Sequence, residues 1–198
     1  MKAFRPIAFL VLFMASLVLL AGCDIFSTRE EEKPEEPRSD YEVPFRAEIL
    51  ISNFSKSLLQ KNVQNYLASF ADSSFSSAPY TFVPSAGSQA QYPELAQGWS
   101  RQNESDFFNN LVTKVTQDLP ITISFSDTLL IPLADSAEFS SRYTLSVPHR
   151  DPVFPTVFQG EMRLKLVRDQ RLMWVIREWQ DIKNSSLPTF SELKGYFY

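Results

Sequence analysis

Between Ile121 and Trp179, apolar and polar residues alternate in four separate stretches, and this period of two constrains the fold more than any other feature. Such alternation predicts β-strands that bury one face and expose the other. The inward positions are Ile121, Ile123 and Phe125; Phe139, Tyr143, Leu145 and Val147; Phe158, Met162, Leu164 and Leu166; and Leu172, Trp174 and Ile176.

Two departures from the alternation predict how the last strands are joined and bent. Trp179 falls one position out of phase with Ile176, which indicates a β-bulge near Arg177–Glu178. Residues 168–171 are polar and separate the last two stretches, so we expect a hairpin there. The pattern as a whole predicts a four-stranded antiparallel meander with one apolar face.

The chain before Ile121 has the three- and four-residue spacing of helices. A first helix is expected over 45–59 and a second, short helix after an N-cap at Asn62. A third is expected to be capped by Asn103, with Asp106 three residues later. Residues 73–92 are expected to be irregular apart from one short strand through 80–83.

An apolar sheet face needs a cover, and these helices supply the apolar surface for it. The predicted fold class is therefore α+β, with the N-terminal helices packed in the concave face of a bent antiparallel sheet.

This order of elements resembles the nuclear transport factor 2-like (cystatin-like, SnoaL-like) superfamily over residues 45–198. The resemblance lies in residues 65–70 (NYLASF), Phe82-Val83-Pro84 and residues 174–181 (WVIREWQD). The tail from Pro188 to Lys194 also resembles that of small lipoproteins with this fold. The resemblance implies a cone that opens into an apolar pocket between sheet and helices, used as an active site, as a ligand or partner site, or as plain core.

The first 22 residues predict a secretory leader. Lys2 and Arg5 precede an apolar run, and Leu20-Ala21-Gly22-Cys23 closes it. This motif resembles the bacterial lipobox, which implies cleavage between Gly22 and Cys23 and acylation of Cys23. Two or more acyl chains hold a protein stably at a bilayer. We therefore expect a lipoprotein of the bacterial cell envelope, in the outer membrane if the cell is Gram-negative.

Residues 23–44 are expected to be an extended acidic tether ahead of a domain over 45–198. Residues 23–40 hold seven acidic and three basic residues, a net charge of −4, and Pro34, Pro37 and Pro44 interrupt the segment. The folded part has no basic stripe, so nucleic acid is not an expected partner. The expected partners are the membrane, through the lipid, and an envelope protein or a small apolar ligand.

The sequence predicts no metal site, no cofactor and no catalytic group. Cys23 is the only cysteine and His149 the only histidine, too few for the usual zinc ligands. His149-Arg150-Asp151 matches the start of a kinase catalytic loop, but position 156 is Thr where an Asn is needed. We interpret this stretch as a loop between strands.

The predicted function is non-catalytic binding in or around the cone. The expected pocket lining is aromatic: Tyr66, Trp99, Tyr143, Trp174 and Trp179. The alternative is an isomerase- or hydratase-like enzyme in which Asp72, Asp106 or Asp181 is the general base and Tyr66 or Tyr143 stabilises the oxyanion. The resemblance also implies a homodimer through the outer sheet face, to which Val157, Val167, Met173 and Val175 are expected to contribute.

Overall fold

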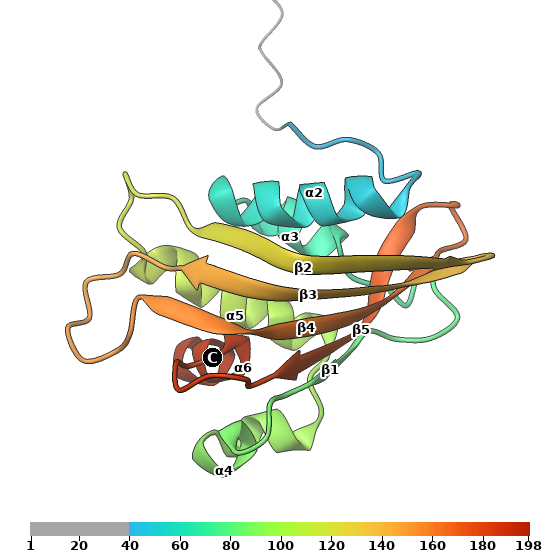
Figure 1. Ribbon diagram of the computed structural model, residues 1–198. Helices are drawn as coiled ribbons and strands as arrows, with labels where there is room; N and C mark the ends of the chain where they lie inside the picture. Colours follow the sequence, from blue (N-terminus) through green and yellow to red (C-terminus); the bar gives the residue numbers. More distant parts are fainter. Residues whose placement is uncertain (1–39) are drawn as a thin grey trace, which may run out of the picture. The chain divides into compact units, whose positions relative to one another are not determined.

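The computed structural model describes residues 40–198, and its centre is a five-stranded sheet in the order β1-β5-β4-β3-β2 (Figure 1). Four consecutive strands pair antiparallel and form the predicted meander. β1 is added parallel to β5. The strands are β1 (Thr81–Val83), β2 (Thr122–Leu133), β3 (Ser136–Ser146), β4 (Val157–Arg168) and β5 (Trp174–Ile182).

The predicted bulge bends β5 at Arg177. Lys165 pairs with Glu178, whereas the next residue, Leu166, pairs with Ile176, so Arg177 is the extra residue. The slip lets both Ile176 and Trp179 face the core, where both are fully buried. The prediction for Leu172 was wrong: it lies in the turn with φ of 62° and is 66% exposed.

The first two predicted helices are present as α2 (Ala47–Leu59) and α3 (Val63–Ala68), and the Asn62 side chain caps α3 by accepting from Asn65 N–H at 3.0 Å. The cap predicted for the third helix was wrong. α5 (Arg101–Lys114) begins one turn earlier, because Ser100 and Asn103 form the capping box.

Three short helices were not predicted: α4 (Ser88–Gln91), the 3-10 helix η1 (Pro93–Gln97) and α6 (Phe190–Phe197). α6 has a capping box in its sequence, Thr189-x-x-Glu192, in which Glu192 Oε2 accepts from Thr189 N–H at 2.8 Å. This helix inserts between sheet and helices and decides what occupies the interior.

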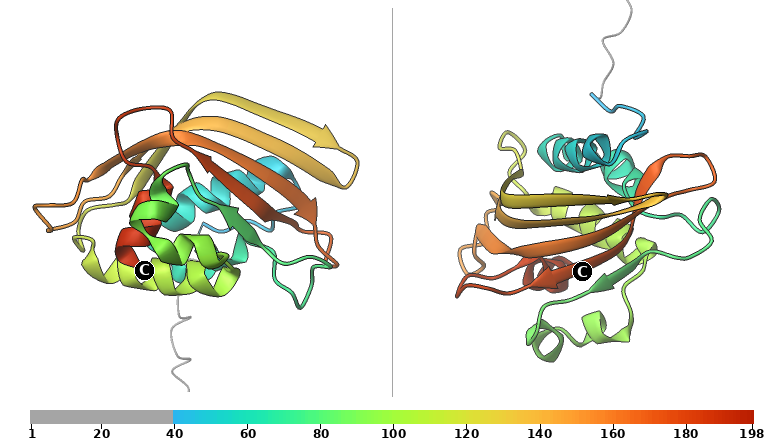
Figure 2. Two further views of the ribbon diagram at one scale, coloured as in Figure 1. Left: turned by 90° about the horizontal axis from the view of Figure 1, so that it is seen from below. Right: turned by 45° about the vertical axis from the view of Figure 1, so that its right-hand side comes forward.

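The sheet bends over the helices, which lie in its concave face as the α+β prediction requires (Figure 2). The centre is aromatic: the Trp179 ring meets Phe54, Phe82 and Phe190 edge-on, with centroids 4.7–5.6 Å apart. Within residues 40–198 no helix has the length and apolarity needed to cross a bilayer.

Residues 40–44 run along α2 and are hydrogen-bonded to the domain. Asn53, which is buried, exchanges two hydrogen bonds with the backbone of Glu42, and Trp174 N–H donates to Pro44 O at 2.8 Å. Residues 40–44, which the sequence placed in the tether, are thus bound to the domain. The leader, Cys23 and the tether up to residue 39 lie outside the described residues.

Several loops meet beyond the last turn of α2. Lys61 Nζ donates to the carbonyl groups of Thr116, Gln117 and Leu119 at 2.6–3.1 Å. Thr116 N–H in turn donates to Pro148 O at 2.8 Å, which joins this loop to the one between β3 and β4. Lys56, in the last turn of α2, donates to Asp40 O at 3.1 Å, so the first described residue lies beside this same end of α2.

Candidate functional site

A fully buried ion pair lies in the interior where the sequence predicted a pocket. Glu104, on α5, and Lys194, on α6, form a salt bridge, and both side chains have 0% exposure. Each occupies the apolar stripe of its own helix: Glu104 lies three and four residues before Phe107 and Phe108, and Lys194 follows Leu193. Packing of these stripes therefore carries both charges inside.

Every donor around Glu104 is directed at its carboxylate. Tyr80 OH and Trp99 Nε1 donate to Oε1 at 2.6 and 3.0 Å, and Tyr66 OH donates to Oε2 at 2.7 Å. Burial, reinforced by the adjacent carboxylate, raises the pKa of both tyrosines well above 10.0, so they remain neutral donors. The carboxylate is fully satisfied by the protein itself.

The Lys194 ammonium sits among aromatic rings, 3.6 Å from the centroid of Phe82 and 3.9 Å from that of Trp179. Burial lowers the pKa of Lys194 from 10.5 to about 8, although Glu104 opposes that shift. The indole N–H of Trp179 has no hydrogen-bond partner within residues 40–198. The faces of the Phe82 and Trp179 rings and the Glu104 carboxylate thus stabilise the buried ammonium of Lys194.

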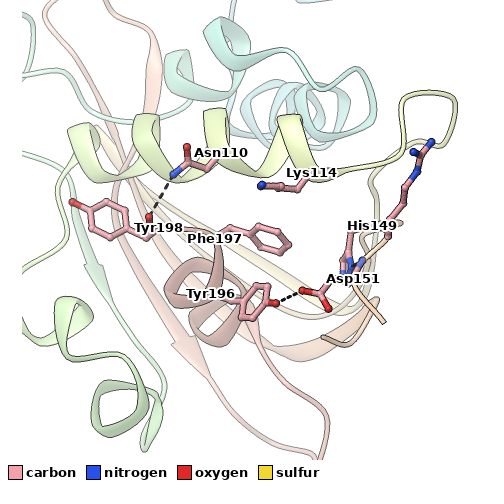
Figure 3. A pocket seen from close by; sticks show the side chains of 8 residues that line it. Asn110, Lys114, His149, Asp151, Tyr196, Phe197 and Tyr198 are labelled. Carbon is pink, nitrogen blue, oxygen red and sulfur yellow. Dashed lines mark hydrogen bonds between the residues drawn. The ribbon is translucent and has the colours of Figure 1, made fainter. Parts of the chain in front are cut away.

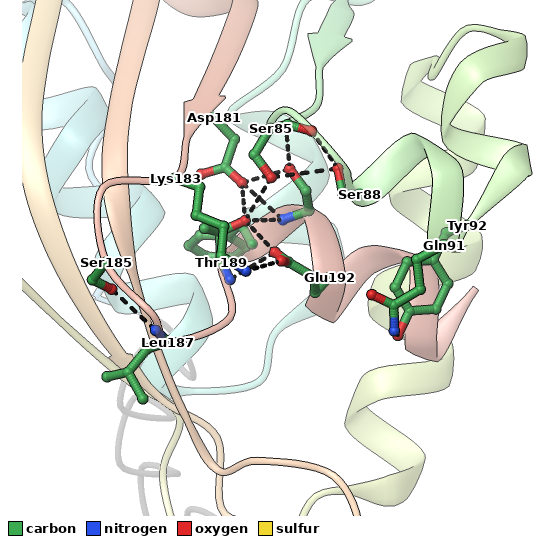
Figure 4. A network of polar contacts seen from close by, with 12 residues as sticks. Ser85, Ser88, Gln91, Tyr92, Asp181, Lys183, Ser185, Leu187, Thr189 and Glu192 are labelled. Carbon is green, nitrogen blue, oxygen red and sulfur yellow. Dashed lines mark hydrogen bonds and ion pairs between the residues drawn. The ribbon is translucent and has the colours of Figure 1, made fainter.

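A second buried carboxylate, Asp181 at the end of β5, holds the start of α6 (Figure 4). Oδ2 accepts from Thr189 Oγ1 at 2.6 Å and from Ser191 N–H and Oγ–H at 2.8 and 2.5 Å. Oδ1 accepts from Tyr143 OH at 2.7 Å. Burial raises the pKa of Asp181 although these donors oppose the shift. The carboxylate lies at a helix N-terminus, where negative charge is favourable.

The hydrogen bond between Tyr143 and Asp181 has room in the sheet only because residue 160 is glycine. A Cβ there would lie 2.7 Å from Tyr143 Oη and 2.9 Å from Ile182 O. Tyr143 also accepts from Phe190 N–H at 2.8 Å, so it links β3, β5 and α6. Glu104, through Lys194, and Asp181, through Thr189 and Ser191, therefore both hold α6 in place.

An open pocket of about 590 Å³ lies at the surface of the domain (Figure 3). Its walls come from three segments: the last turns of α5, the loop after β3, and the end of α6. The lining residues are Asn110, Lys114, His149, Arg150, Asp151, Tyr196, Phe197 and Tyr198.

The loop wall of this pocket is braced by its own side chains. His149 Nδ1 accepts from Asp151 N–H at 3.2 Å, and Nε2 lies 2.9 Å from Pro155 O, so both ring nitrogens are used. Tyr196 OH donates to the Asp151 carboxylate, and this hydrogen bond lowers the pKa of Asp151. The sequence interpretation of His149–Asp151 as a loop is confirmed.

The five aromatic residues predicted to line a pocket are all buried, and none of them lines the pocket of Figure 3. Tyr66 and Trp99 converge on Glu104, Tyr143 binds Asp181, and Trp179 lies at the centre of the core. Trp174 is apart from these, with the Arg168 guanidinium 5.4 Å from its ring centroid.

Of the three carboxylates predicted as general bases, only Asp181 is in the interior. Asp72 forms an ion pair with Arg101 at 3.3 Å, and a hydrogen bond from Ser74 N–H lowers its pKa. Asp106 is exposed and accepts from Gln102 at 3.0 Å. Within residues 40–198 no cluster of His, Cys, Asp or Glu could hold a metal ion.

Sequence reasoning missed Glu104 and Lys194 as interior residues. The available signal was a charged residue on each of two apolar helical stripes, opposite in sign. It also misplaced Val175, which was expected on the outer sheet face but is 1% exposed. Met173 and Val167 are partly buried and Val157 is 39% exposed, and the homodimer itself stays a prediction.

No protein-family model and no curated protein matches this sequence. Several solved structures share its fold. A Novosphingobium aromaticivorans protein proposed to be an aromatic ring hydroxylase has a TM-score of 0.55 at 11% identity, covering 82% of this chain and 99% of its own. A Streptomyces avermitilis protein proposed to be a dehydratase of the NTF2-like family has a TM-score of 0.52 at 7% identity, covering 70% and 94%.

A second protein from Novosphingobium aromaticivorans, proposed to be a scytalone dehydratase, has a TM-score of 0.53 at 10% identity and covers 72% of this chain and 88% of its own. At such low identity these similarities concern the fold. The fold is therefore nuclear transport factor 2-like, as the sequence predicted, and the chemistry has to be argued from the residues of this chain.

Proposed function

We propose that this nuclear transport factor 2-like domain is a non-catalytic binding module, tethered to a membrane of the bacterial envelope by a lipid on Cys23. Its ligand site would be the pocket between α5, α6 and the loop after β3.

One observation carries the non-catalytic assignment. Both interior carboxylates already accept hydrogen bonds from several protein donors, and their residues are 0% and 2% exposed. A general base must reach a substrate proton at hydrogen-bond distance. Glu104 and Asp181 could reach a substrate proton only if α6 moved away from them.

The anchor is tested on the native protein. Mass spectrometry should find a mature chain that begins at Cys23 and carries a thioether-linked lipid and an acylated amino group. The Cys23→Ser variant should keep its leader. An unmodified Cys23 with the leader attached would contradict the anchor.

The binding site is tested by native mass spectrometry of the purified full chain. We expect a bound small molecule in the wild type that is absent from Asn110→Trp, in which a bulky ring at an exposed position fills the pocket. Asn109→Trp, on the neighbouring exposed position of α5, is the control. Identical spectra for the wild type and Asn110→Trp would contradict the assignment.

A proton-transfer enzyme is the second candidate, favoured by one contact. Asp181 has a raised pKa and lies 2.7 Å from Tyr143 OH, a carboxylate–phenol pair suited to proton abstraction, and related folds include proteins proposed to be dehydratases. Exchange of carbon-bound protons of hydroxy-carbonyl compounds with D₂O, followed by NMR, tests it. Exchange that disappears in Asp181→Asn would support the enzyme, and no exchange in the wild type would support the binding module.

A further inference from the structure

Two cations line the pocket of Figure 3 without a partner of their own. Lys114 projects from the last turn of α5, and Arg150 lies in the loop after β3. Neither side chain has a hydrogen bond or ion pair within residues 40–198, whereas Lys56, Lys61, Lys183 and Lys194 all do. An unpaired cation in a concavity attracts an anion more strongly than one on a convex surface.

The pocket lining also holds one carboxylate, that of Asp151, which forms no ion pair with either cation within residues 40–198. The Asp151 carboxylate accepts from Tyr196 OH and, at 2.9 Å, from Val153 N–H. Both ring nitrogens of His149 form hydrogen bonds with the loop backbone. Two cationic side chains against one carboxylate leave a net positive charge among the Lys, Arg and Asp side chains of the lining.

One wall of the pocket is aromatic and firmly packed. The Tyr196 ring stacks on Phe154 with centroids 3.6 Å apart, and Phe197 packs edge-on against both. Phe197 is 7% exposed and Tyr196 is 39% exposed, so flat apolar surface is offered to the pocket. Rings fixed in this way can take an apolar group without further ordering.

We propose that the ligand of this pocket is a small organic anion. Its acidic group, a carboxylate or a phosphate, would be attracted by the positive charge of Lys114 and Arg150, and its flat apolar body would pack against Tyr196 and Phe197. The volume of about 590 Å³ falls within the range of small-molecule sites. The inference rests on the proposed function, because it names the ligand class of the same site.

Isothermal titration calorimetry of the full chain with matched probes tests the ligand class. The probes are 2-naphthoate, its neutral isostere 2-naphthamide, and 2-naphthyl phosphate. We expect the anions to bind at least tenfold more tightly than the amide, since hydrogen bonds to charged groups are the stronger ones. The ratio of naphthoate to phosphate affinity then identifies the acidic group.

Variants assign the effect to the two cations. Lys114→Gln and Arg150→Gln should each weaken anion binding roughly tenfold and leave 2-naphthamide unchanged. Arg163→Gln, which breaks an exposed pair with Glu161 on the outer sheet face, is the control and should change nothing. Anion affinity equal in all four proteins would overturn the proposal.

The remaining outcomes separate this inference from the proposed function. If the amide binds as tightly as the anions and Asn110→Trp blocks it, the pocket is a ligand site and the anionic class is wrong. If Asn110→Trp leaves the binding of every probe and the native mass spectrum unchanged, the site itself is wrong, and both proposals fall.

Discussion

The carboxylates of Glu104 and Asp181 are both buried, yet they are satisfied in different ways. Glu104 faces a cation, Lys194, and three neutral donors. Asp181 is held by neutral donors from Tyr143, Thr189 and Ser191. When one partner of a buried ion pair is removed, the remaining charge stays buried without a counter-charge, and the free energy of unfolding falls strongly. A carboxylate bound by dipoles should be more tolerant of neutralisation.

The largest expected effect comes from removing the charge of Glu104. Glu104→Leu leaves the Lys194 ammonium buried without its partner, so the free energy of unfolding should fall by about 3–5 kcal/mol in urea titrations. The double variant Glu104→Leu, Lys194→Met should recover at least half of this loss, because no charge stays buried. A double variant as unstable as Glu104→Leu would contradict the pairing.

A smaller loss is expected at the second carboxylate. Asp181→Asn keeps the shape and one acceptor but turns an amide N–H toward the donors of α6, which should cost about 2–3 kcal/mol. Urea unfolding monitored by tryptophan fluorescence measures it. Asp106→Asn, the same change at an exposed residue, should stay within about 0.5 kcal/mol. An equal loss of unfolding free energy at Asp181 and at Glu104 would contradict the expectation that a carboxylate bound by neutral donors tolerates neutralisation better.

The smallest effect is a pH dependence peculiar to the ion pair. In the unfolded chain Lys194 has its ordinary pKa of 10.5, whereas in the folded protein its pKa is about 8. Between these values the unfolded state binds more protons, so this lysine makes the free energy of unfolding rise with pH. Below 10.0 the buried tyrosines stay protonated in both states.

From about pH 7 to about pH 9.5, the wild type should therefore gain about 1–2 kcal/mol relative to Lys194→Met. Lys165→Met removes an exposed lysine of the outer sheet face and should follow the wild type. Guanidinium titrations at both pH values measure the difference. A constant difference between the wild type and Lys194→Met would show that the ammonium is not buried in the folded protein.

Period and phase were enough to predict the meander, the helices in its concave face and the bulge at Arg177, because each depends on residues close in sequence. The interior was not predictable in the same way. Glu104 and Lys194 are 90 residues apart, and only the docking of α6 reveals that they meet. The pocket of Figure 3 likewise depends on three segments whose proximity no local pattern encodes.

The seating of α6 also has a consequence for how the chain acquires its structure. Lys194, Thr189 and Ser191 supply donors to both interior carboxylates, and each lies far along the chain from Glu104. A growing polypeptide that stops short of them would bury unsatisfied acids if it collapsed, so it gains little by closing early. Such a chain gains its full stability only once residues 189–194 are available to dock.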